Sequence, residues 1–144
     1  MAVNQVFAFS PEKTREWLVP AGTTTGTAVI STSNQAGVAV TTRPDVSVTK
    51  TYADGSTRTF LANTTGQTPN SVTVATDGSW SFPVAGASAA TPKDTLVYAV
   101  VVSGAVTSLT LNSNAGANVK FGTVDSFPGK ATAASTVVKI GVFA

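Results

Sequence analysis

The chain of 144 residues contains neither cysteine nor histidine. Without cysteine it can form no disulfide bond and offers no thiolate to a metal ion. Without histidine it lacks the side chain that titrates nearest to neutral pH, which excludes Ser-His-Asp and Cys-His catalytic arrangements. No segment has the closely spaced Asp residues of a calcium-binding loop. We therefore expect no metal and no cofactor.

Charge is scarce as well. Only 11% of the residues are charged, whereas about 25% is usual for soluble domains. The nine Lys and Arg residues are nearly balanced by seven Asp and Glu residues, and they are spread singly along the chain. Nucleic-acid binding needs clustered cations that displace counterions. We therefore expect no direct contact with nucleic acid.

Long apolar runs are missing too. No stretch reaches the roughly 18 apolar residues that cross a bilayer. The first residues also lack the basic and apolar segments of a secretory signal. We expect synthesis in the cytosol and no membrane partner.

Serine and threonine are abundant and make up roughly a quarter of the chain. With 42% hydrophobic residues and a net charge of only +2, the chain has the balance of a folded protein of one domain. Its surface must consist mainly of hydroxyl and amide groups. Such a weakly charged surface suits a protein that is packed against neighbours.

The carboxylates are explained by turns. Asp54 and Asp77 each precede a glycine, and Asp94 lies in a Pro-Lys-Asp turn. Aspartate is common there because its side chain bonds to the nearby backbone. The chain also lacks a Gly-x-Ser-x-Gly nucleophile elbow. We expect a structural or binding module and not an enzyme.

Alternating apolar and polar residues predict strands in two regions, 46–61 and 71–84. Each region is centred on an Asp-Gly pair, and the glycine supplies the positive φ that a tight turn requires. We therefore predict two hairpins, the first turning at Ala53-Asp54-Gly55 and the second at Asp77-Gly78, where the two residues alone form the turn. In the second, Trp80 and Phe82 lie on the apolar side and are expected in the core.

Further short strands are predicted along the rest of the chain. Residues 27–32 and 36–42 read as a tight strand pair, and a first strand begins at Trp17. The nearly continuous apolar run 95–103 predicts a central strand buried on both faces. The remaining strands are predicted at residues 106–111, 119–124 and 137–143. With no convincing amphipathic helix, the pattern indicates an all-β fold, a small β-barrel or β-sandwich.

Residues 1–16 show no clean period and are predicted to form an extended N-terminal arm, with one helical turn after Ser10. The β domain then covers residues 17–144. We favour an arm that docks on a partner over one that packs on its own domain. The predicted contacts with a partner or a second subunit are apolar, aromatic or cationic: Val3, Val6, Phe7, Phe9, Trp17, Tyr52, Arg58 and Phe60.

Short motifs follow one another in a distinctive order. They are Val19-Pro20-Ala21-Gly22, Gly26 to Val29, Ala36-Gly37-Val38-Ala39-Val40-Thr41, Trp80 to Gly86, Lys93 to Tyr98, Phe121 to Val124 and Val137 to Phe143. This order resembles that of the small phage capsid cement, or head decoration, proteins. The arm and residues 44–70 lie outside the resemblance, so the first Asp-Gly hairpin reads as an insertion.

The resemblance implies a β-rich homotrimer on the outer surface of a phage head. There it would bind the major capsid protein and stabilise the virion by bridging capsid subunits. Three alternatives remain open. A carbohydrate-binding or adhesive module would expose Trp17 or Tyr52 on one concave face. Another virion subunit, in a tail tube or as a minor capsid protein, would assemble without heads. An enzyme would place a pair of Asp residues in a deep pocket.

Overall fold

The computed structural model describes residues 5–7, 14–43, 47–61 and 70–141, with the backbone alone at 5–7, 47–48 and 60–61. These residues form β-strands, as predicted, and one short 3-10 turn, Asn114–Gly116. The strands are β1 (Gln5–Phe7), β2 (Thr14–Leu18), β3 (Ala28–Ile30), β4 (Ala36–Ala39), β5 (Ser47–Thr51), β6 (Thr57–Leu61), β7 (Ser71–Ala75), β8 (Gly78–Phe82), β9 (Leu96–Val102), β10 (Ala105–Thr110), β11 (Val119–Val124) and β12 (Thr136–Ile140).

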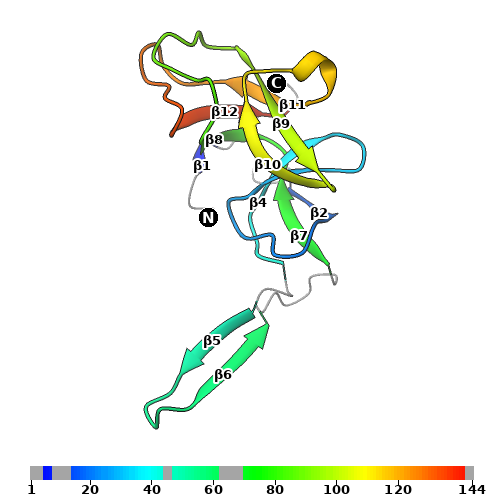
Figure 1. Ribbon diagram of the computed structural model, residues 1–144, viewed down its shortest axis with the longest axis vertical. Helices are drawn as coiled ribbons and strands as arrows, with labels where there is room; N and C mark the ends of the chain where they lie inside the picture. The colour runs from blue at the N-terminus through cyan, green and yellow to red at the C-terminus, as the bar shows by residue number, and fades with distance from the viewer. Residues whose placement is uncertain (1–4, 8–13, 44–46, 62–69, 142–144) are drawn as a thin grey trace.

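The larger sheet contains six antiparallel strands in the order β1-β8-β12-β11-β9-β10 (Figure 1). It curls until its two sides nearly meet. The chain just after β8 reaches the free side of β10, where the Ala85 N–H donates to the Leu109 carbonyl at 2.9 Å and the Leu111 N–H donates to the Ala85 carbonyl at 3.1 Å. The sheet is therefore close to a closed barrel.

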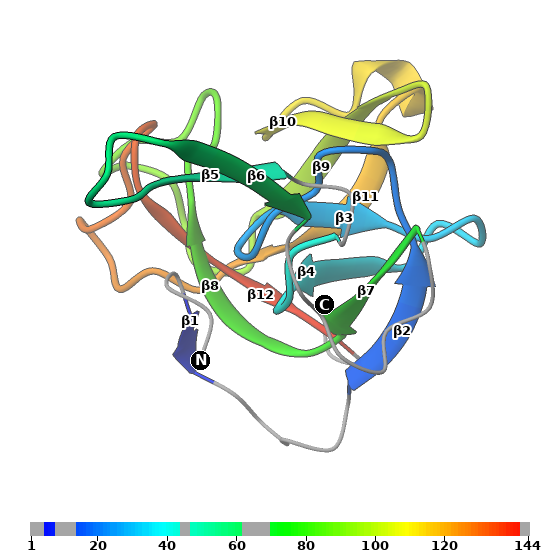
Figure 2. The same ribbon diagram turned by 90° about the horizontal axis from the view of Figure 1, so that it is seen from below.

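A second sheet of four strands, in the order β2-β7-β4-β3, lies against the curled one (Figure 2). The main core fills the space between them. Trp80 and Phe121 are its largest fully buried side chains, and the rings of Phe82 and Phe121 meet edge to face with centroids 5.8 Å apart. Trp80 and Phe82 are thus in the core, as predicted. A smaller cluster, formed by Val19, Val29, Ala39, Val72 and Val74, packs with Trp17.

The first Asp-Gly hairpin is confirmed. Strands β5 and β6 pair with each other as a separate two-stranded sheet, which projects away from the two larger sheets in Figure 1. Its turn consists of Ala53-Asp54-Gly55, as predicted. The Tyr52 N–H donates to the Ser56 carbonyl at 2.8 Å, and only Gly55 in the intervening loop has a positive φ, of 82°. The loop therefore has three residues and ends in a left-handed glycine.

The prediction of a second hairpin, at residues 71–84, is wrong. Strands β7 and β8 form where alternation predicts them, but β7 pairs with β2 and β4, whereas β8 pairs with β1 and β12. The Asp77-Gly78 pair forms a corner between the two sheets. Only Gly78 has a positive φ there, of 103°, whereas a type I′ turn needs two such residues. The indole Nε1 of Trp80 donates to the Asp77 carbonyl at 3.0 Å and fixes the corner against the core.

The prediction that residues 95–103 form a strand buried on both faces is only partly right for β9. It lies between β10 and β11, so it is flanked by strands on both sides as expected. It is buried on one face only: Val97 and Ala99 are fully buried, whereas Leu96 is 40% and Val102 56% exposed. The apolar residues on the outer face hid the alternation from the sequence pattern.

The other strands fall close to their predicted positions. Strands β3 and β4 form the expected antiparallel pair, and β10, β11 and β12 lie within the three predicted regions or one residue outside them. The first strand of the predicted β domain starts at Thr14 rather than Trp17. The helical turn predicted after Ser10 lies outside the described residues.

Candidate functional site

The projecting hairpin has two chemically different faces. In its register Lys50 lies directly opposite Arg58, and Thr49 directly opposite Thr59. Since side chains alternate along a strand, Tyr52 shares the face of Lys50 and Arg58. The opposite face carries Thr49 and Thr59, whose hydroxyl oxygens are 3.0 Å apart, together with Thr51 and Thr57. Residues 49–59 are all exposed. One face is therefore cationic and aromatic, and the other is a neutral row of hydroxyls.

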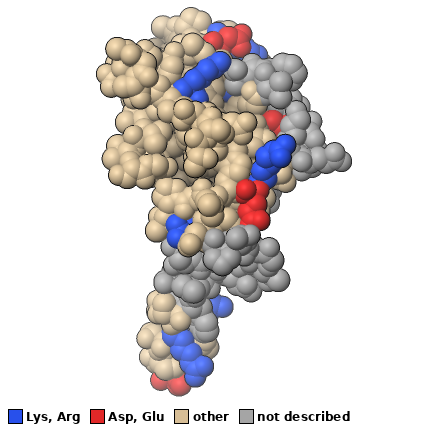
Figure 3. Space-filling view, turned by 90° about the vertical axis from the view of Figure 1, so that its right-hand side faces the viewer, with Lys and Arg blue, Asp and Glu red and all other residues tan. Residues whose placement is uncertain are grey.

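The cations of this face have no acidic partner within the part of the chain that the structure describes. The guanidinium carbon of Arg58 lies 5.6 Å from the centre of the Tyr52 ring, a cation–π geometry. The nearest acidic residue in sequence, Asp54 at the tip, accepts hydrogen bonds from the Ser56 hydroxyl at 2.6 Å and the Ser56 N–H at 2.9 Å. These bonds hold the pKa of Asp54 below its usual value. Figure 3 shows blue and red atoms on the hairpin and a mostly uncharged body above it.

The base of the insertion is clamped by Arg43 and Asn70. One guanidinium nitrogen of Arg43 donates to the Val19 carbonyl at 2.7 Å, and the other donates to Asn70 Oδ1 at 2.6 Å. The Val19 N–H in turn donates to the Asn70 carbonyl at 3.1 Å. The two ends of the segment 44–69 are thus held together on the body. This clamp was not predicted, because it joins residues 27 positions apart that follow no recognisable motif.

Trp17 lies far from the face that Tyr52 shares, on the four-stranded sheet. It is half-buried and packs against the cluster of Val19, Val29 and Val74. A Cβ added to Gly37 would come within 2.8 Å of its ring, so the indole covers the glycine backbone. Trp17 is therefore partly covered on the four-stranded sheet, whereas Tyr52 is 42% exposed on the hairpin.

The arm residues are described only in part. Residues Gln5–Phe7, which include Val6 and Phe7, form β1 and pair with β8 at the edge of the six-stranded sheet. Val3 and Phe9 lie outside the described residues. The side chains of Val6, Phe7 and Phe60 are also outside the description, although the backbone of Phe60 pairs with that of Val48 in the hairpin. Their predicted contacts with a partner remain predictions.

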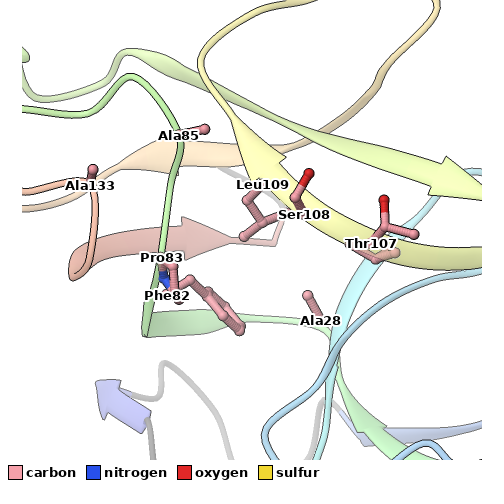
Figure 4. A pocket seen from close by; sticks show the side chains of 9 residues that line it. Ala28, Phe82, Pro83, Ala85, Thr107, Ser108, Leu109 and Ala133 are labelled. Atoms are coloured by element: carbon pink, nitrogen blue, oxygen red, sulfur yellow. The ribbon is translucent and has the colours of Figure 1, made fainter.

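An apolar pocket of about 500 Å³ lies where the curled sheet nearly closes (Figure 4). Its wall is formed by Ala28, Phe82, Pro83, Ala85, Val106, Thr107, Ser108, Leu109 and Ala133. The polar side chains of the lining are the hydroxyls of Thr107 and Ser108, and the lining contains no acidic or basic residue. The pocket can shelter apolar groups, but it offers no acid or base for catalysis.

A polar cluster ties the turn before β9 to the six-stranded sheet. Asp125 accepts a hydrogen bond from the Ser79 hydroxyl at 2.6 Å and forms an ion pair with Lys93, with Lys93 Nζ 3.0 Å from Asp125 Oδ1. Burial raises the pKa of Asp125, but the bonds from Ser79 and Lys93 and the charges of Lys93 and Lys139 outweigh it, so the pKa is lowered. The bond and charge of Asp125 raise the pKa of Lys93. A general-base lysine needs a lowered pKa, so this cluster has the properties of a structural contact.

Among the described residues, the aspartates are spread over the structure, except that the Asp94 N–H donates to the Val124 carbonyl next to Asp125. Asp54 lies at the hairpin tip, Asp77 in the corner between the sheets and Asp125 in the Lys93 cluster. Among the described residues, acidic side chains nowhere gather in the threes that a metal site requires. Ser10 with Lys13, and Ser47 with Lys50, have the spacing of a Ser-x-x-Lys motif, but the side chains of Ser10, Lys13 and Ser47 lie outside the described residues.

Comparison of the chain with protein-family models, with curated proteins and with solved structures finds no match. The described residues also include no helix with the length and hydropathy needed to cross a membrane.

Proposed function

We propose that the chain is a capsid decoration subunit, which binds the outer surface of a phage head as a homotrimer and bridges subunits of the major capsid protein. The sequence motifs that resemble small capsid cement proteins support the proposal, because six of the seven motif segments overlap a strand of the two larger sheets: β3, β4, β8, β9, β11 or β12. The body is tightly packed and its surface carries little charge. Such a part acts by adding interface that must break before the shell can deform.

The projecting hairpin is the observation that carries the proposal. A two-stranded sheet on its own is marginally stable in water, and residues 49–59 of this one have no cover on either face. It interrupts the connection between β4 and β7, which are neighbours in the sheet. The body does not need the insertion to pair these strands, so the hairpin serves an external contact.

The alternative of a carbohydrate-binding module has less support. Sugar binding is favoured by several exposed aromatic rings on a common surface. The half-buried Trp17 ring covers Gly37, and the exposed Tyr52 ring lies on the hairpin beside Arg58, so the two rings form no common surface. An adhesive role and a role elsewhere in the virion are separated from decoration by the experiment below.

The test replaces residues 44–69 with Asn-Gly. The pairing of Val38 with Ala75 and Ala39 with Val74, continued along both strands, brings Arg43 opposite Asn70, where a two-residue turn closes a hairpin. The shortened chain should keep the thermal unfolding midpoint of the full chain. Co-sedimentation with shells assembled from the major capsid protein of the same phage should be lost.

This replacement separates folding from binding better than removal of the arm does. Deletion of residues 1–15 would take away β1 and the first two residues of β2, and both strands belong to sheets of the body. A full-length chain that fails to bind shells would refute decoration. Tubes or rings formed by the full-length chain alone would favour a tail-tube subunit.

A further inference from the structure

We infer that the cationic face of the hairpin, formed by Lys50, Tyr52 and Arg58, binds a carboxylate-bearing protein surface. The inference rests on the proposed function, because the acidic surface is then part of the capsid shell. It goes further by naming the face that makes the contact and the chemistry of its partner.

The position of the two cations is the first step. Lys50 and Arg58 are directly opposite in the register, where Cβ atoms of paired residues are about 4.5–5.5 Å apart. Like charges at this distance destabilise a strand pair. A hairpin without packing support retains this repulsion at a cost to its own folding. Partner carboxylates placed over the face would remove the repulsion and order the hairpin.

The second step is that the protein itself does not neutralise the pair. Within the described residues Lys50 and Arg58 make no ion pair, and the acidic oxygen at the tip, Asp54 Oδ1, is bound by Ser56. Elsewhere Lys93 is paired with Asp125. The hairpin thus presents two free cations beside an exposed aromatic ring.

The Arg58 guanidinium is held in place before any partner binds. The Tyr52 ring supports the Arg58 guanidinium from one side, which limits the orientations of the long side chain before it binds. A planar guanidinium forms paired hydrogen bonds with a carboxylate, and less freedom is lost when it is held in advance. The arrangement suits a discrete Asp or Glu side chain on the partner.

A protein surface fits better than a nucleic acid. A nucleic-acid site uses many cations that follow the phosphate backbone, whereas this face has two, and Asp54 at the tip would repel a polyanion. The opposite face has four threonines and no charge. Two cations and one anion on a small hairpin match the mixed charges of a protein surface.

The test compares two double variants with the same change in net charge. Lys50→Glu with Arg58→Glu reverses the hairpin face, and Lys120→Glu with Lys130→Glu reverses two exposed lysines on the body. Binding to shells of the major capsid protein is measured by co-sedimentation. The hairpin variant should bind at least about tenfold more weakly, because charges of the same sign then face each other across the interface. The body variant should bind as the original chain does.

Four results would overturn the inference. Equal binding by the hairpin variant and the original chain would show that the face is not the contact, while decoration itself would stand. Equal loss in the body variant would reduce the effect to net charge. Retention of a short DNA duplex by the original chain at the affinity it has for shells, lost with Lys50→Glu and Arg58→Glu, would show a polyanion site. Failure of the original chain to bind shells would refute the proposed function as well.

Discussion

Gly122 occupies a place in β11 where no larger residue fits. A Cβ added there would lie 2.3 Å from the Lys139 carbonyl oxygen, 3.1 Å from Val138 Cγ1 and 3.2 Å from Ile140 Cγ2. An ordinary carbon–oxygen contact is about 3.3 Å, so β12 would have to move by about 1 Å. The obstacle is a backbone atom, and its two flanking side chains are fully buried. The strand cannot move without disturbing the core.

Gly122→Ala should therefore lower the free energy of unfolding by about 3 kcal/mol, at the upper end of the range for overpacking. For a chain of this size the midpoint of thermal unfolding should fall by roughly 6–12 °C. The fluorescence of the buried Trp80 reports the transition, and urea unfolding at 25 °C gives the free energy directly.

Gly129→Ala is the matched control. Its added Cβ would meet nothing within 4 Å, and its φ is +81°, so only backbone strain is expected, about 1–2 kcal/mol. If Gly122→Ala costs no more than Gly129→Ala, the close approach of β11 and β12 is not as tight as described, and the reasoning fails.

Three further changes test other contacts. Asp125→Asn should lower the free energy of unfolding at pH 7 by about 1 kcal/mol. Folding lowers the pKa of Asp125. The carboxylate therefore stabilises the fold at pH values above the ordinary aspartate pKa near 4, and this stabilisation is lost as the pH falls further. The difference in urea midpoint between pH 7 and pH 3 should thus shrink in the variant, and an unchanged difference would contradict the role given to the pair with Lys93. Trp80→Phe should cost about 2–4 kcal/mol, because it leaves a cavity and removes the donor to the Asp77 carbonyl; a loss under 1 kcal/mol in urea unfolding would argue against that bond. Arg43→Ala should cost about 1–2 kcal/mol by freeing two acceptors at the base of the insertion, and faster proteolytic cleavage within 44–69 should accompany it; cleavage at the original rate would mean that the clamp does not hold the base.

The two Asp-Gly pairs show where prediction from sequence reaches its limit. Both lie between alternating strands, yet the first closes a hairpin and the second turns the chain from one sheet into another. The difference lies outside the local sequence. The Trp80 indole donates to the carbonyl of Asp77. Gly141 packs against the same corner, where a Cβ added to this glycine would lie only 3.0 Å from the Asp77 Cβ. Only the folded core brings these residues together.

The candidate site was predicted in part. Tyr52 and Arg58 were predicted as contacts with a partner, and the structure shows both side chains exposed, with the guanidinium over the ring. The importance of Lys50 was missed, although alternation within the predicted strands places it beside Tyr52. Trp17 was grouped with them on chemical type alone, and packing against Val74 and Gly37 puts it on another sheet.

The sequence by itself determined that this chain forms β-strands, where most of them lie, and that His and Cys chemistry is absent. Those properties depend on composition and on a period of two residues, which are local. Local sequence also indicated the β3–β4 and β5–β6 pairs. Tertiary structure decided how the other strands pair, because their hydrogen bonds join residues as far apart as Trp17 and Val72. It also decided that the hairpin stands apart from the body, with its two cations on one face and no ion pair to an acid among the described residues.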